Sequence, residues 1–273
     1  MTRTMTTRTG AAPAATSART AHRARALLAC GVAAGPLYLV VGLTQAFTRD
    51  GFDLRRHALS LLSNGDLGWI QIGNFLVSGL LVLACAVGLR RALRSGRGRT
   101  WGPRLVGCYG VGLVAAAVFR ADPALGFPVG TPADANAVSW HGLLHFVSAT
   151  FGFLALIAAC LVFARRFRAG GQRGWAAYCV ATGMLFLAAF LGIASGTGRA
   201  WINIAFCVAV VIVWAWISVL AARLMTAPAP ASVTAPVTAP GTAPGTVPGI
   251  VPAGGEAVEP GRAAAYRRAS LTR

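Results

Sequence analysis

The sequence predicts an all-α protein, a six-transmembrane-helix bundle with disordered N- and C-terminal tails. Six stretches contain no Arg, Asp or Glu, and each approaches the ~20 residues that a helix needs to cross the hydrocarbon core of a bilayer. The chain is 56% apolar and only 12% charged, whereas a soluble domain carries about 25% charged residues. The apolar stretches are 26–48, 67–89, 105–119, 135–164, 174–198 and 200–222.

Charge is sorted between the connections. All 25 basic residues are Arg, and the net charge is +18. The two terminal segments, together with the connections after the second and fourth spans, hold 20 of these arginines. The other three connections hold five arginines and five of the seven acidic residues. By the positive-inside rule, this predicts a multi-pass cell-membrane protein with both termini cytoplasmic. The basic charge is explained by this topology, so we expect a lipid bilayer as partner and no nucleic acid.

The chain divides into three parts. Residues 1–25 are rich in Thr, Ala and Arg without periodicity, which predicts a disordered basic cytoplasmic tail. Residues 26–224 form the membrane domain. Residues 225–273 repeat Thr-Ala-Pro units, which favour extended chain over helix and predict a second disordered cytoplasmic tail. An Ala- and Arg-rich chain without Lys is typical of a high-GC bacterial genome.

The spans differ in their details. The first contains Gly31 and Gly35, a GxxxG spacing that allows close helix approach, which we expect to be used within the molecule. The apolar stretch of this first span is longer than the 7–15-residue core of a signal peptide, which favours a membrane span over a cleaved signal. The third is the shortest, but Arg104 and Arg120 can extend toward the interfaces and allow a span over 102–121. Tryptophans mark the membrane interfaces at the ends of the other spans: Trp69, Trp140, Trp175 and Trp201.

Polar side chains that could carry chemistry gather at one face, which the topology predicts to be external. His141 and His145 are four residues apart and share one helix face. With His57 and Asp122 they form a candidate metal site, for which zinc is the expected ion. The spacing lacks the Glu of the HExxH motif, so that metalloprotease signature is absent.

A second polar set lies inside the spans at a similar depth. Gln71, Asn74 and Ser78 form a stripe on the second span, and Asn203 opens the sixth. Ser60 follows His57 by three residues. Because unpaired polar groups are costly inside a membrane, we expect these residues to face one another and to line an outward-facing polar pocket. A structural hydrogen-bond network between helices is the alternative interpretation.

The motifs at this face resemble the prokaryotic domain of unknown function 998 family over about 27–222. The resemblance implies a six-helix integral membrane protein with its motif residues at the outer face. No activity is established for the family, so it implies no substrate. The family often has an acidic residue directly after the loop Ser, where this chain has Leu61; this weighs against a Ser60–acid pair. The matching segments are Phe52–Ser60, Gly65–Gln71, Asn74–Phe75, Ala121–Pro123, Gly126–Pro128, Gly130, Ser139–Gly142 and His145.

Three functions remain open at this point. The first is a membrane protein of unestablished activity whose outward-facing pocket binds a lipid headgroup or a small solute. The second is a metal-dependent hydrolase at the external face, in which a bound ion would activate water. The third is a structural or accessory membrane protein. The sequence does not determine whether the protein is an enzyme, nor its oligomeric state. The pocket candidates are His57, Ser60, Gln71, Asn74, Asp122, His141, His145 and Asn203, and the metal candidates among them are His57, Asp122, His141 and His145.

Overall fold

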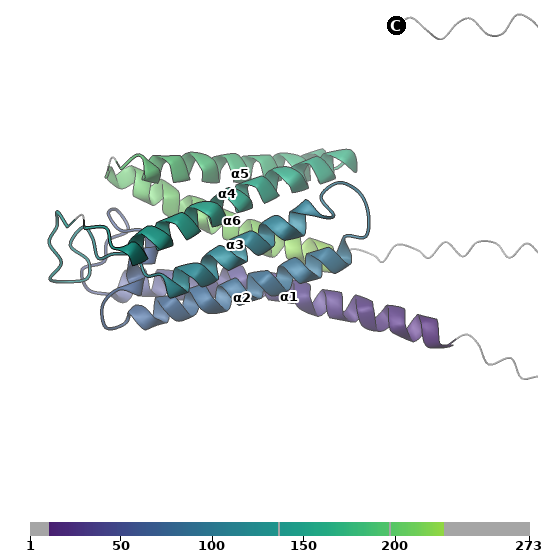
Figure 1. Ribbon diagram of the computed structural model, residues 1–273. Helices are drawn as coiled ribbons and strands as arrows, with labels where there is room; N and C mark the ends of the chain where they lie inside the picture. The colour runs from purple at the N-terminus through teal and green to yellow at the C-terminus, as the bar shows by residue number, and fades with distance from the viewer. Residues whose placement is uncertain (1–10, 136, 197, 227–273) are drawn as a thin grey trace, which may run out of the picture. The chain divides into compact units, whose positions relative to one another are not determined.

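The computed structural model describes residues 11–226 except 136 and 197, and this part of the chain is helical without strands (Figure 1). Among the described residues, six helices are long and apolar enough to cross a membrane, which confirms the predicted bundle. The elements are α1 (Ala11–Thr48), the short 3-10 helix η1 (Leu59–Ser63), α2 (Gly68–Ala92), α3 (Trp101–Val118), α4 (Trp140–Ala169), α5 (Arg173–Ala194) and α6 (Ala200–Thr226).

The helices pack in a ring that follows the order of the sequence. Each helix contacts the next, and α6 returns to pack against α1. The short helix η1 packs against α1 and α2. A helix satisfies its backbone hydrogen bonds within itself, which is why these apolar segments can all lie in hydrocarbon. The ring leaves a central space that side chains from every helix approach.

Small residues bring α1 close to both of its neighbours. A Cβ atom at Gly31 would overlap the Cys85 thiol of α2, and a Cβ atom at Gly35 would overlap the Ser218 hydroxyl of α6. The Ser218 hydroxyl also donates a hydrogen bond to the Gly31 carbonyl at 3.3 Å. The GxxxG spacing is therefore used for packing inside the molecule, as the sequence analysis expects.

Helix α1 is longer than its apolar stretch. It begins at Ala11, inside the segment for which the sequence predicts a disordered tail. Ala and Arg are strong helix formers, so the helix continues past the membrane-spanning residues. Residues 1–10 and 227–273 lie outside the described residues, and with them the rest of both predicted tails.

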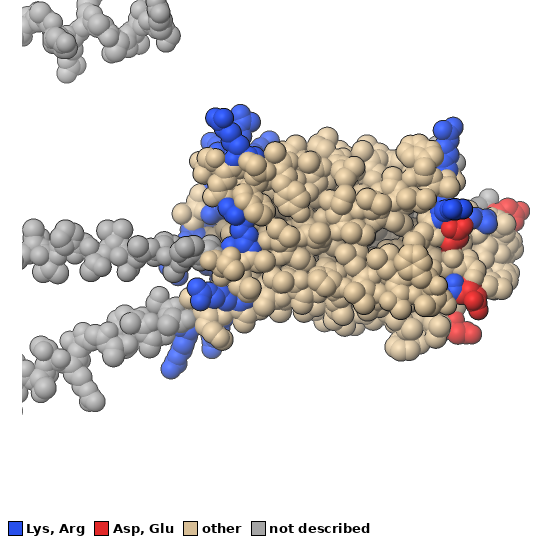
Figure 2. Space-filling model, turned by 180° about the vertical axis from the view of Figure 1, so that it is seen from behind, with Lys and Arg blue, Asp and Glu red and all other residues tan. Residues whose placement is uncertain are grey.

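The two ends of the bundle differ in charge (Figure 2). The arginine-rich end consists of residues 19–25, 90–104, 165–173 and 223–226. The carboxylate-bearing end consists of loop A (residues 49–67, including η1), loop B (residues 119–139) and the α5–α6 turn. All carboxylates of the described residues lie in loops A and B: Asp50, Asp53, Asp66, Asp122 and Asp134.

Candidate functional site

Loop A is folded back over the bundle by Arg49. Its guanidinium donates hydrogen bonds to the carbonyl oxygens of Leu62 at 2.6 Å and Asn64 at 2.7 Å. The same group lies over the ring of Phe127, 5.0 Å from its centroid, and so joins loop A to loop B. Partial burial lowers the pKa of Arg49, and the Asp66 carboxylate opposes that shift. Because both donors belong to one planar guanidinium, they hold the end of η1 against the beginning of loop A.

His57 is a buried link between the two loops. The Asp53 amide donates to its Nδ1 at 2.9 Å. Because that nitrogen accepts, the proton lies on Nε2, which donates to the Leu125 carbonyl at 3.1 Å. The ring also lies among those of Phe52 and Phe127, with centroids 5.2 and 5.6 Å away. Both ring nitrogens are used by backbone groups, so the imidazole has no lone pair left for a metal.

Asp122 holds the start of α4. Its carboxylate accepts hydrogen bonds from the amide of Ser139, at 2.8 Å, and from the Ser139 hydroxyl. That hydroxyl in turn accepts from the Gly142 amide at 3.1 Å and caps the helix. A Cβ atom at Gly142 would overlap the carboxylate. His141, which precedes Gly142 in the sequence, is exposed, and its ring lies against that of Trp140. These contacts give Asp122 a structural role at the helix N-terminus.

His145 is buried, and its Nδ1 lies 2.8 Å from the Phe119 carbonyl at the end of α3. The structure places Asp122, His141 and His145 around the end of α3 and the start of α4, whereas His57 lies between loops A and B. Among the described residues, no group of three or more His, Cys, Asp or Glu side chains could hold a metal ion. The polar atoms of three of these candidates instead make hydrogen bonds to protein groups: His57 to Leu125, Asp122 to Ser139, and His145 to Phe119. The four candidates are His57, Asp122, His141 and His145.

The polar stripe of α2 forms a network with α1. The Gln71 side-chain oxygen accepts from Gln45 at 3.0 Å and from Asn74 at 3.2 Å. The Asn74 amide also donates to the Tyr38 carbonyl at 3.1 Å, and Ser78 donates to Asn74 at 3.3 Å. The four side chains that form these bonds are all buried. The stripe therefore joins two neighbouring helices, and it does not line the central cavity described below.

Asn203 connects α6 to loop A. Its side-chain amide donates to the Arg55 carbonyl at 3.2 Å. Together with the contacts of Arg49 and His57, this bond fixes loop A to α6 and to loop B. Loop A therefore covers the carboxylate-bearing end of the ring.

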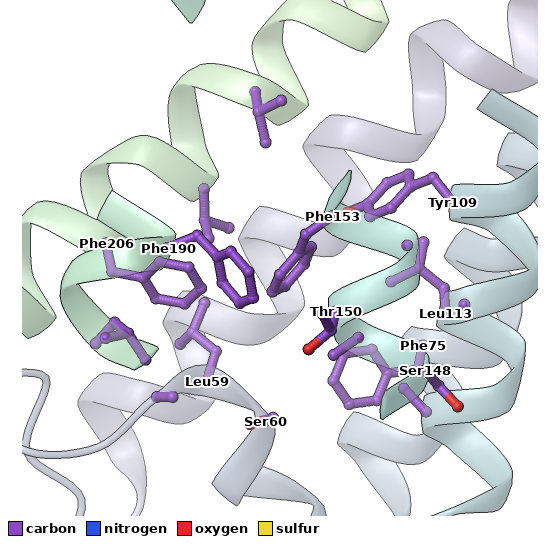
Figure 3. A pocket seen from close by; sticks show the side chains of 18 of the residues that line it. Leu59, Ser60, Phe75, Tyr109, Leu113, Ser148, Thr150, Phe153, Phe190 and Phe206 are labelled. Atoms are coloured by element: carbon purple, nitrogen blue, oxygen red, sulfur yellow. The ribbon is translucent and has the colours of Figure 1, made fainter. Parts of the chain in front are cut away.

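A cavity of about 140 Å³ lies in the centre of the ring, beneath η1. All six helices contribute to its wall. Figure 3 shows Phe75, Phe153 and Phe190 among the side chains around it. Most of the lining is aromatic or aliphatic. One lining residue from each helix in turn is Tyr38, Phe75, Leu113, Phe153, Phe190 and Trp214.

A few polar groups interrupt the apolar lining. Ser60, His145 and Ser148 lie on the wall. The Thr150 hydroxyl oxygen is buried without a hydrogen-bond partner among the described residues, and Figure 3 shows it at the edge of the cavity. A buried hydroxyl is costly unless it is paired, so Thr150 places an unpaired polar atom beside the apolar wall.

Of the pocket residues predicted from the sequence, Ser60 and His145 line this cavity. Gln71 and Asn74 lie in the α1–α2 network. His57, Asp122 and Asn203 organise the covering loops. His141 is exposed. The structure therefore distributes the predicted set among four places: the cavity, the α1–α2 network, the covering loops and the exposed surface.

The sequence reasoning did not find the aromatic wall of the cavity. The ring of Phe153 lies edge-to-face against those of Phe186, Phe190 and Phe206, with centroids 5.1, 5.4 and 5.9 Å apart. The four-residue separation of Phe186 and Phe190 places them on one face of α5. Because the lipid-facing side of these helices is also apolar, no polarity pattern marks that face as the inner one.

The comparisons with known proteins agree with the resemblance stated from the motifs. A family model described as Protein of unknown function (DUF998) matches residues 32–223. No curated protein and no solved structure matches the chain. The family match begins in α1 and ends in α6, so it includes both loops and the cavity. Since it covers more than half of the sequence, the chain belongs to the DUF998 family of proteins of unknown function.

Proposed function

We propose that this protein binds a lipid or a similar amphipathic molecule without transforming it, and that the central cavity holds the apolar part of that molecule. The observation that carries this proposal is the cavity itself, which has an aromatic and aliphatic wall drawn from every helix of a membrane bundle. Small-molecule sites are typically concave, mostly apolar and furnished with a few polar groups.

The chemistry of the wall favours an amphipathic occupant. Rings such as Phe153, Phe190 and Trp214 offer contact surface to an acyl or isoprenoid chain. Thr150 supplies an unpaired hydroxyl, and Ser60 lies where η1 covers the cavity. An occupant with one polar group and one apolar chain would satisfy both kinds of surface. This apolar site differs from the polar pocket predicted from the sequence, of whose residues Ser60 and His145 line the cavity.

The orientation in the membrane is part of the proposal. Cytoplasmic connections of membrane proteins are enriched in Arg and Lys. By this rule the arginine-rich end is cytoplasmic, and so are the beginning of α1 and the end of α6. Loops A and B then face the outside, and a ligand reaches the cavity from the outer leaflet or the external medium.

The hydrolase alternative receives less support from the side chains. His57 and Asp122 are engaged by backbone groups, and His141 is exposed. A hydrolytic metal site needs three protein ligands around one ion and an open position for water. Binding without catalysis requires none of these.

Filling the cavity is the direct test. Ala149 lines the cavity, whereas Ala188 is exposed on α5. We expect Ala149→Phe to displace the occupant and Ala188→Phe to leave it in place. The full-length proteins would be reconstituted with a mixed bacterial-type lipid extract and washed in detergent, and the retained lipid would be measured by native mass spectrometry.

The proposal predicts a retained lipid in the wild type and in Ala188→Phe, and its loss in Ala149→Phe. Thermal unfolding and size-exclusion profiles would establish that both variants are folded. Equal retention in the two folded variants would overturn the proposal, because the lipid would then be bound on the outer surface.

A further inference from the structure

We propose that the arginine-rich end carries a second site, a cleft that binds the phosphate of an anionic membrane lipid. The site is separate from the central cavity and does not rest on the function proposed for it. The cleft, called here the arginine cleft, has a volume of about 660 Å³. It lies between the α2–α3 connection, the α4–α5 turn and the end of α6.

Arg166 is fixed at one wall of the cleft. Its guanidinium donates to the carbonyl oxygens of Ser95 at 2.8 Å and Arg97 at 3.0 Å. These bonds orient the group, and they join α4 to the α2–α3 connection. Both acceptors are neutral, so the positive charge of Arg166 is held in place without being neutralised.

Arg223, which also lines the cleft, is fixed by different groups. It donates to the Gln172 side-chain oxygen at 2.7 Å. Its guanidinium also lies over the rings of Trp175 and Phe167, 4.2 and 5.5 Å from their centroids. Stacking on aromatic faces preorganises a guanidinium and leaves its edge available for hydrogen bonds. Arg223 is thus a second preset cation, and it too has only neutral partners here.

The charge of the cleft is not balanced by the described part of the protein. Arg97, Arg166 and Arg223 all line it. The carboxylates of the described residues all lie in loops A and B, at the other end of the bundle. Helix α5 begins at Arg173 beside the cleft, and a helix N-terminus adds positive potential. An anion is the complementary ligand, and guanidinium groups match phosphate oxygens in geometry.

The surroundings favour a lipid over a free anion. The cleft lies at the ends of helices that are long and apolar enough to cross a membrane. Phe167, Ala169 and Leu224 provide apolar edges next to the arginines, and Trp175 marks the membrane interface. A phosphate joined to glycerol and acyl chains would contact both surfaces. Basic clefts between transmembrane helices are a known mode of anionic headgroup recognition.

The test compares arginines inside and outside the cleft. The cleft variant is Arg166→Gln/Arg223→Gln. The control is Arg91→Gln/Arg94→Gln, which removes the same charge from exposed positions at the same end. Binding of phosphatidylglycerol and of phosphatidylcholine to each full-length protein in detergent would be titrated by native mass spectrometry.

We expect the wild type and the control to prefer phosphatidylglycerol. At about fivefold per arginine, the cleft variant should bind it about 25-fold more weakly, with phosphatidylcholine binding unchanged. An equal loss in both double variants would overturn the site, because general charge alone would explain the binding. Inorganic phosphate that displaces phosphatidylglycerol at equal concentration would overturn the lipid assignment.

The double cleft variant removes two interhelical contacts, so a milder variant guards against misfolding. Arg97 is exposed and lines the cleft, and the bond from Arg166 involves its backbone carbonyl only. Arg97→Gln should fold normally and bind phosphatidylglycerol about fivefold more weakly. Unchanged affinity in both folded cleft variants would contradict the proposal.

Discussion

At the scale of single residues, the polar groups near the cavity fall into two kinds. Most are saturated: His57 uses both ring nitrogens, and Asp122 accepts from the backbone and hydroxyl of Ser139. Thr150 differs, because its buried hydroxyl has no partner among the described residues. Saturated groups contribute to stability, whereas an unpaired group costs stability and is available to a ligand. Thr150 is therefore the residue at which binding and stability should oppose each other.

We expect Thr150→Val to stabilise the lipid-free protein by about 1 kcal/mol, because the substitution removes an unpaired buried hydroxyl at nearly constant volume. The matched control is Ser78→Ala, since the buried Ser78 hydroxyl donates a hydrogen bond to the Asn74 side chain at 3.3 Å and its loss should destabilise. Chemical unfolding in detergent after lipid removal gives both values. Destabilisation of similar size in the two variants would show that Thr150 is paired in solution.

His57 should behave as a structural residue. His57→Ala leaves the Asp53 amide and the Leu125 carbonyl unpaired, which we expect to cost about 1–3 kcal/mol.

Elemental analysis of the purified wild type should show no stoichiometric zinc. Zinc near one equivalent that disappears in His141→Ala/His145→Ala would instead restore the hydrolase alternative.

At the scale of elements, α1 and α2 are joined by side-chain hydrogen bonds as well as by close packing. Gln71 is the centre of this network, since its oxygen accepts from both Gln45 and Asn74. Polar bonds between membrane helices contribute modestly, about 0.6 kcal/mol on average. The network consequently fixes how two helices are rotated and translated against each other, while packing supplies most of the association energy.

Gln71→Leu should destabilise the protein by about 1 kcal/mol, because the side-chain amides of Gln45 and Asn74 each lose one of their two acceptors. Gln45→Leu in the same background should cost less than it does in the wild type, with a coupling near 0.6 kcal/mol in a double-mutant cycle. Val77→Ala, on the exposed side of α2, is the control and should have a small effect. Strictly additive effects would mean that the Gln45–Gln71 bond contributes nothing.

At the scale of the whole molecule, the ring of helices separates two chemical environments. One end carries arginines in the absence of described carboxylates, and the other carries loops A and B. Each end has its own concave region, the arginine cleft at the first and the cavity covered by η1 nearer the second. The arginine cleft and the central cavity are therefore separate regions along the length of the helices.

The orientation proposed above predicts which loops are accessible from outside the cell. An epitope inserted after Asp134, in exposed loop B, should be detected on intact cells. The same epitope inserted after Gly171, in the exposed α4–α5 turn, should be detected only after permeabilisation. The reverse pattern would place the arginine-rich end outside, against the positive-inside rule.

The candidate site was predictable only in part. Ser60 and His145 were predicted as pocket residues and do line the cavity. The roles of His57 and Asp122 could not be read from spacing, because their partners are backbone groups of Leu125 and Ser139. Any residue can supply a backbone partner, so the sequence holds no signal for it. The aromatic wall was missed for the related reason that lipid-facing and inward-facing residues are both apolar.

The sequence by itself determined the helices, their number and the sorting of charge between the two ends. These follow from local physical requirements: apolar length sets each membrane span, and arginines remain near the interfaces. Only the tertiary structure decided which polar residues meet, where the cavity lies and how Arg166 and Arg223 come to share a cleft. Contacts between distant segments depend on how helices rotate and pack, and a uniformly apolar helix carries little local information about which face turns inward.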